Sequence, residues 1–144
     1  MHLEELEGGT ILCGGKALEL GGEFEGGFFF RPAVIEGVDQ NSRTNQEDIF
    51  GPIITITPFD TDEEAIKMAN NSIYGKAATV WTQNTSRANK IAESLKAGII
   101  WVNSWMLQDE RVSFVPFDAS GNAVIGGMEA LHFFTERKLI GQPL

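Results

Sequence analysis

Two carboxylates and an aromatic side chain stand close together in the stretch Gln46-Glu47-Asp48-Ile49-Phe50-Gly51-Pro52. A carboxylate accepts hydrogen bonds from hydroxyl groups, and an aromatic ring offers an apolar wall to a flat ligand. Gly51 and Pro52 predict a turn directly after these side chains. The stretch is therefore a candidate ligand-binding loop. The alternative is a solvated loop acid followed by a phenylalanine of the core.

The other residue types that could do chemistry are few and scattered. The two histidines, His2 and His132, have no ligand-type neighbours at metal-site spacing, so no metal site is predicted. The single cysteine, Cys13, lies in an apparent strand, where a buried thiol behaves as a small hydrophobe rather than a nucleophile. The glycine pairs at 21–22 and 26–27 match neither GxxxxGK(S/T) nor GxGxxG between a strand and a helix. Taken alone, these patterns indicate no catalytic residue.

Composition predicts one domain with a core of its own. The chain has 144 residues, of which 42% are hydrophobic. Eleven basic residues against twenty acidic ones give a net charge of −9, which argues against a nucleic-acid or anionic-membrane partner. One cysteine excludes an internal disulfide and suits a reducing compartment. With neither a secretory signal pattern nor an apolar run approaching the ~20 residues of a membrane span, we predict a cytoplasmic protein.

Hydrophobic periodicity and turn residues divide the chain into alternating strands and helices. Strands are predicted at residues 10–15, 33–38, 53–58, 77–82 and 99–102, and loops at 14–27 and 39–48. A helix is predicted from Thr61, where Glu64 completes capping-box spacing. A second is predicted from Asn84 or Thr85, with Gly98 as its C-terminal glycine. Leu3 to Leu6 predict the tail of another helix.

The strand–helix–strand–helix–strand order of residues 53–102 predicts an α/β fold with a parallel sheet and right-handed crossovers. Residues 104–125 predict a long irregular loop, and loops of this length in compact domains are typically functional. A helix at 127–134 and a strand at 136–140 are predicted to complete the chain.

Several short segments, taken together in their order along the chain, indicate a protein family more specifically than any one of them does alone. They are Gln46 to Pro52, Pro58-Phe59-Asp60, Glu64-Ala65-Ile66, Ala69-Asn70-Asn71, Tyr74-Gly75, Val80-Trp81-Thr82, Ala97-Gly98, Trp101-Val102-Asn103 and Phe133 to Lys138. This order closely resembles the C-terminal part of the NAD(P)-dependent aldehyde dehydrogenase superfamily, over nearly the whole chain. Within the family, residues 11–15 and 103–111 look most like the branch that oxidises 2-hydroxymuconic and 2-aminomuconic semialdehydes.

The resemblance implies a partial aldehyde dehydrogenase catalytic domain: a mostly parallel sheet, helices on its faces and a C-terminal oligomerisation strand. Residues 1–134 would belong to the catalytic domain, and residues 135–144 would form the oligomerisation strand and tail. The partners expected are a second copy of the chain, a full-length relative, or a polypeptide carrying the missing N-terminal part.

The resemblance also implies roles for individual residues. In the family, the acid before Ile-Phe-Gly-Pro binds the nicotinamide ribose hydroxyls and the phenylalanine packs near the nicotinamide ring, which maps NAD(P) binding onto Asp48 and Phe50. The family usually has glutamate at the first position, so Asp48 is one methylene shorter. Gln108, Arg111 and Phe114 map onto the substrate pocket. Arg111 either grips a substrate carboxylate or is solvated beside the acids that precede it.

The chain also departs from the family. The segments that match the catalytic cysteine, the general-base glutamate and the dinucleotide-binding domain precede its first residue, and Cys13 matches a non-catalytic cysteine of some relatives. Where the family has paired glycines and then Gly-Arg-Glu, this chain has Val115-Pro116 and Ala123-Val124-Ile125. We therefore expect a truncated aldehyde dehydrogenase-like protein with no catalytic residue of its own, inactive alone. An oligomerising scaffold or binding module and one half of a split enzyme are the alternatives.

Overall fold

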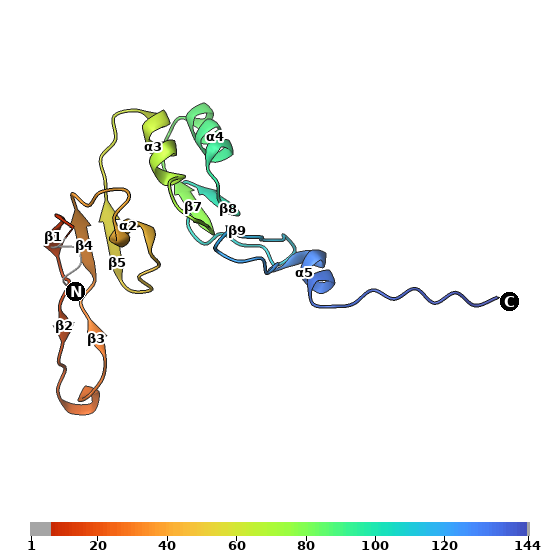
Figure 1. Cartoon of the computed structure of the whole chain (residues 1–144), viewed down its shortest axis with the longest axis horizontal. Coiled ribbons are helices and arrows are strands. Elements are labelled where there is room, and N and C mark those ends of the chain that lie inside the picture. Colours follow the sequence, from red (N-terminus) through yellow and green to blue (C-terminus); the bar gives the residue numbers. More distant parts are fainter. Residues whose placement is uncertain (1–6, 144) are drawn as a thin grey trace. The chain divides into compact units, whose positions relative to one another are not determined.

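The computed structural model describes residues 7–143, and the chain divides into two compact units, residues 1–64 and 65–144. Each unit is described by itself, with its elements labelled in Figure 1. The helix tail predicted at Leu3 to Leu6, and His2, lie outside the described residues. Within residues 7–143, none of the helices has the length and apolar character needed to cross a membrane.

The first unit is built on a three-stranded sheet in the order β1-β4-β5. Strand β4 (Ala33–Glu36) pairs antiparallel with β1 (Thr10–Cys13) and parallel with β5 (Ile53–Ile56). Its central position buries alternate side chains, and Ile35 is fully buried. These strands lie within the ranges predicted from periodicity, although β1 is mostly exposed rather than buried.

The predicted loop at 14–27 is partly wrong, because its ends belong to a hairpin. Strands β2 (Ala17–Leu18) and β3 (Phe29–Phe30) pair antiparallel, and a 3-10 turn, η1 (Gly22–Phe24), lies at the tip. In Figure 1 this hairpin continues from β1 and β4 as one ribbon. The ribbon requires glycine at position 14: φ is 72°, and a Cβ there would lie 1.6 Å from the carbonyl oxygen of Pro32.

The predicted loop at 39–48 contains one helical turn, α2 (Arg43–Gln46). Ser42 caps it, with its Oγ accepting the Asn45 N–H at 3.3 Å. The Glu7 carboxylate accepts the N–H groups of Arg43 at 2.8 Å and Thr44 at 3.1 Å, and the buried Thr44 hydroxyl at 2.5 Å. That hydroxyl bond lowers the pKa of Glu7. Two of the three capped N–H groups are therefore bonded by Glu7, which lies 36 positions before Arg43, and local sequence patterns do not reveal this partner.

Helix α3 (Asp62–Ala69) leads from the first unit into the second. Its predicted capping box forms in a shifted version. Thr61 Oγ1 accepts the Glu64 N–H at 3.1 Å as predicted, while the Glu64 carboxylate accepts the N–H of Asp60, one residue before the cap, at 2.8 Å. The next helix, α4 (Thr85–Ser94), is capped by Asn84, whose Oδ1 accepts the Arg87 N–H at 3.0 Å.

In the second unit, strands β7 (Ala77–Val80) and β8 (Ile99–Val102) pair in parallel, and α4 connects them, as the strand–helix–strand pattern predicts. Each of these three elements contributes one buried side chain: Val80 of β7, Ala88 of α4 and Trp101 of β8. Two short strands, β6 (Tyr74–Gly75) and β9 (Phe117–Asp118), pair antiparallel, and helix α5 (Gly127–Phe133) confirms the helix predicted near the end.

The α/β class is confirmed, but the described residues do not form one continuous parallel sheet. Their strands fall into four sheets, with parallel pairing in β4–β5 and β7–β8 and antiparallel pairing elsewhere. Residues 136–143 form no helix or strand within the described chain. Pairing of residues 136–140 with another subunit stays a prediction.

Gly98 is not the C-terminal glycine of α4, which ends at Ser94 with Leu95 as its C-cap. Its role is close approach of the backbone. A Cβ at Gly98 would lie 2.0 Å from the carbonyl oxygen of Val115. The loop that follows β8 therefore folds directly back over the start of that strand.

Candidate functional site

The loop after α2 presents Asp48 and Phe50 to solvent. The Phe50 backbone has a φ of 50°, and its side chain is 94% exposed. Asp48 Oδ1 accepts the Phe50 N–H at 3.1 Å, which holds the turn. A non-glycine residue at positive φ is strained by roughly 1–3 kcal/mol, and such residues cluster at functional sites. The phenylalanine expected in the core under one alternative is thus on the surface.

The two carboxylates of this loop have different surroundings. Glu47 pairs with Arg43 of α2, with Nε–Oε1 at 2.6 Å and Nη2–Oε2 at 3.0 Å, and this hydrogen bonding lowers the pKa of Glu47. Asp48 is exposed and bonds only the backbone of its own turn within the described residues. Of the acidic pair, Glu47 therefore anchors the loop to the helix, and Asp48 retains acceptor capacity for a ligand.

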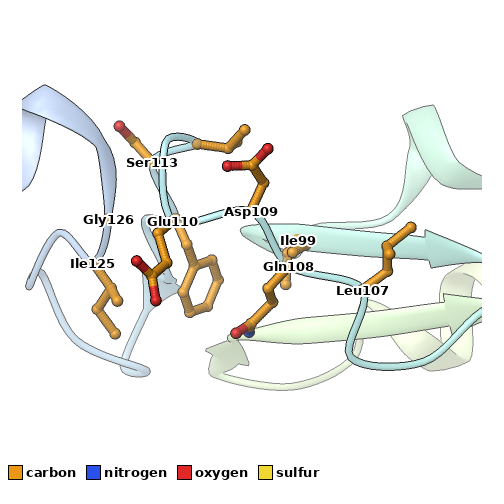
Figure 2. A pocket seen from close by; sticks show the side chains of 10 residues that line it. Ile99, Leu107, Gln108, Asp109, Glu110, Ser113, Ile125 and Gly126 are labelled. Atoms are coloured by element: carbon orange, nitrogen blue, oxygen red, sulfur yellow. The ribbon is translucent and has the colours of Figure 1, made fainter.

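A pocket of about 520 Å³ lies in the second unit, between β8 and the loop that follows it. Its lining comprises Ile99, Leu107, Gln108, Asp109, Glu110, Val112, Ser113, Phe114, Ile125 and Gly126 (Figure 2). The structure therefore brings together two of the three residues assigned to a substrate pocket, Gln108 and Phe114. The third, Arg111, is not among the lining residues.

Arg111 pairs with Asp109 at the surface, which is the second of its two alternatives. Its Nε donates to Asp109 Oδ1 at 2.8 Å and its Nη2 to Oδ2 at 2.5 Å. The guanidinium lowers the pKa of the Asp109 carboxyl. Since most of the Arg111 side chain is exposed, a role in gripping a substrate carboxylate stays a prediction.

Buried Trp101 holds one wall of the pocket in place. Its Nε1 donates to the Leu107 carbonyl at 2.7 Å, and its ring meets that of Trp105 edge-on with centroids 5.2 Å apart. The Asn103 side chain bonds both backbone groups of Thr82 at 2.8 Å, just beyond the paired ends of β7 and β8. Asn103 and Met106 both have positive φ. Sequence reasoning had not assigned any of these positioning contacts.

The opposite wall of the pocket is a backbone pairing across the loop. Phe114 and Ile125 exchange N–H···O bonds of 2.8 and 3.0 Å, and Gly127 N–H bonds the Glu110 carbonyl at 2.8 Å. Gly126 has a φ of 78°, and a Cβ there would meet the Val112 carbonyl at 2.7 Å. The segment between Phe114 and Ile125, which lacks the family's glycine pair, is thus folded back, and its two ends are hydrogen-bonded to each other.

Cys13 lies at the end of β1, as predicted, but it is exposed rather than buried. Its strand is at the edge of the β1-β4-β5 sheet, so one edge of the strand is unpaired among the described residues. In the described part of the chain, its thiol has no hydrogen-bond or ion-pair partner. No cluster of three or more His, Cys, Asp or Glu side chains suited to a metal ion occurs among residues 7–143.

Comparison with known proteins identifies the class to which this architecture belongs. The model of the aldehyde dehydrogenase family matches residues 2–140. The chain is 46% identical over 134 residues to a 2-hydroxymuconic semialdehyde dehydrogenase of Pseudomonas sp. (strain CF600), covering 93% of this chain and 28% of that protein. It is 44% identical over 135 residues to a 2-aminomuconic 6-semialdehyde dehydrogenase of Pseudomonas sp., covering 94% and 28%.

Solved structures agree with the sequence relatives. A mutant indole-3-acetaldehyde dehydrogenase of P. syringae in complex with NAD+ and IAA superimposes with a TM-score of 0.85 at 38% identity, over 93% of this chain and 26% of that one. A betaine aldehyde dehydrogenase of Staphylococcus aureus in complex with NAD+ superimposes with a TM-score of 0.85 at 36% identity, over 92% and 26%.

The chain belongs to the aldehyde dehydrogenase family. It spans about 28% of the length of the curated relatives it matches. The resemblance to the muconic semialdehyde dehydrogenase branch is confirmed by these relatives.

Proposed function

We propose that this chain forms the nicotinamide-side loop and part of the substrate pocket for NAD(P)-dependent oxidation of an aldehyde to an acid. The observation that carries the proposal is the Asp48–Phe50 turn, where a strained backbone exposes an aromatic ring beside a carboxylate with free acceptor capacity. Family membership supports the reaction class, and the NAD+ complexes of solved relatives support the cofactor.

The residues present fit a nicotinamide nucleotide. The Asp48 carboxylate can accept hydrogen bonds from ribose hydroxyls, and the exposed Phe50 ring can cover one face of a flat heterocycle. Bound NAD(P) supplies the hydride acceptor. The loop positions it, with Glu47 holding the turn to α2 through Arg43.

The test uses nicotinamide mononucleotide, which carries only the half of the cofactor that this loop would contact. Added at millimolar concentration to the isotope-labelled chain, it is expected to shift the backbone NMR signals of residues 48–51. Asp48→Asn should weaken binding roughly fivefold or more, since a charged acceptor is worth about 1–3 kcal/mol in a hydrogen bond.

Asp39→Asn is the matched control, because the Asp39 carboxylate makes the same kind of turn by accepting the Asn41 N–H at 2.7 Å. In the same way, Phe28→Ala is the control for Phe50→Ala, because the Phe28 side chain is also fully exposed in the first unit. Unchanged signals at residues 48–51 in saturating nucleotide, or equal losses in Asp39→Asn and Asp48→Asn, would contradict the proposal.

We also propose that the chain associates with a second copy through residues 136–140. Leu139 and Ile140 are 96% and 80% exposed in a segment that forms no strand within the described residues. An unpaired segment gains backbone hydrogen bonds by adding to the edge of another sheet, and Leu139 and Ile140 would bury apolar surface there.

We expect a dimer or larger species by light scattering at micromolar concentration. The double variant Leu139→Asp/Ile140→Asp should be monomeric, while Leu20→Asp, on the hairpin, should not change the mass. A monomeric wild-type chain would refute self-association. A complex that forms only with a full-length relative would instead support the heterologous partner.

A further inference from the structure

Two acidic side chains and no basic one line the pocket of the second unit. The two acids are not equivalent. Asp109 is neutralised by the bidentate Arg111. The Glu110 carboxylate has no hydrogen-bond or ion-pair partner within residues 7–143. One uncompensated negative charge therefore belongs to the pocket.

Glu110 is placed to act on a ligand in the pocket. In Figure 2 its side chain extends to the same side of the loop as that of Gln108, away from the Asp109 carboxylate, and it lines the same pocket as Ile125. The walls around it are largely apolar, from Ile99, Leu107 and Ile125 together with the half-buried Phe114. Glu110 is itself exposed, so solvent and salt partly screen its charge, and the preference it confers on a ligand is expected to be severalfold rather than large.

Arg111 does not offset this charge. Its Nε and Nη2 are both committed to Asp109, and it lies outside the pocket lining. The side chain at 108, which lines the pocket, is a neutral amide that can both donate and accept hydrogen bonds but carries no charge. A ligand carboxylate would thus meet Glu110 and no free cation.

We propose that this pocket selects aldehydes whose far end is cationic or neutral over aldehydes that carry a carboxylate, with Glu110 as the specificity-determining residue. The inference rests on the proposed aldehyde oxidation. It assigns a substrate class different from that in the names of the muconic semialdehyde relatives. The bonds made and broken at the aldehyde are the same for both classes, so only recognition of the far end differs.

Three probes of equal length and different charge test the inference: hexylammonium, hexan-1-ol and hexanoate. Each is titrated into the isotope-labelled chain at low salt, following the signals of Phe114 and Ile125. Hexylammonium is expected to bind roughly three- to tenfold more tightly than hexanoate, with hexanol between them. Raising the salt to about 1 M, where the Debye length is about 3 Å, should shrink the difference.

Glu110→Gln, which keeps the shape of the side chain, should bring the three affinities within about twofold of one another. Glu129→Gln, on helix α5 and outside the pocket lining, should leave the wild-type order unchanged. Arg111→Ala should preserve or increase the preference for hexylammonium, because it frees Asp109.

Tightest binding of hexanoate, abolished by Arg111→Ala, would overturn the inference and establish Arg111 as a carboxylate grip. Equal affinities in the wild type would overturn the charge selection alone. Binding of none of the probes would overturn the inference while leaving the nicotinamide loop, which lies in the other unit, to be judged by its own titration.

Discussion

Replacing Gly98 with alanine is expected to unfold the second unit under conditions where the wild-type chain is folded. A Cβ at this position would lie 2.0 Å from the carbonyl oxygen of Val115, 2.8 Å from its carbon and 3.0 Å from the Phe114 ring. The obstacle is mostly backbone, so no side-chain rotation relieves it. Losses above about 4 kcal/mol are exceptional for one substitution, and they are a large fraction of the 5–15 kcal/mol that stabilises a typical domain.

The measurement is urea unfolding followed by tryptophan fluorescence. All three tryptophans, Trp81, Trp101 and Trp105, lie in the second unit, so the signal reports on that unit alone. The matched control is Gly141→Ala, where an added Cβ meets no atom within 4 Å. It should leave the midpoint unchanged. A Gly98→Ala midpoint within experimental error of the wild type would contradict the close approach of Val115.

A second expected result is that the purified 144-residue chain forms no NADH from an aldehyde. The family reaction needs a thiolate to attack the aldehyde and a base to activate water. The one thiol of this chain is Cys13, which is exposed at the end of an edge strand. An activated thiolate needs an adjacent base, a cation or a helix N-terminus, and the Cys13 thiol has no hydrogen-bond or ion-pair partner among the described residues.

The assay follows NADH absorbance in steady state with hexanal and with a semialdehyde, and a full-length relative serves as the positive control. Turnover that disappears in Cys13→Ser would make Cys13 the nucleophile and end this prediction. Turnover that persists in Cys13→Ser comes from a contaminating enzyme of the expression host, since the variant has no thiol.

Local signals allowed most of the secondary structure to be predicted. The capping box at Thr61 and Glu64 and the Asn84 cap are made by residues within four positions of one another, so their pattern is visible in a single stretch of sequence. The ion pair between Asp109 and Arg111 is equally local, and it agrees with the surface alternative predicted for Arg111. The order of the short segments predicted the family, which the comparisons confirm.

The features that sequence reasoning missed depend on contacts between distant segments. Helix α2 is held by Glu7 from 36 positions away, and the hairpin that replaces the predicted loop is closed by backbone bonds between residues 15–16 and Arg31. The glycine at 98 resembles a helix terminator in sequence, yet it is required by Val115, far along the chain. Such pairings leave little trace in composition, because backbone groups are the same in every residue.

For the two candidate sites, the sequence by itself determined which residue types were present and which family they resemble. It placed Asp48 and Phe50 directly before a turn and Gln108 and Phe114 in a long loop. Only the tertiary structure decided that Phe50 is exposed at positive φ and that Arg111 lies outside the pocket lining. It also decided that Glu110 lines the pocket with no hydrogen-bond or ion-pair partner among residues 7–143. The physical reason is that exposure, strain and charge compensation are properties of neighbours in space. Those neighbours are chosen by the fold.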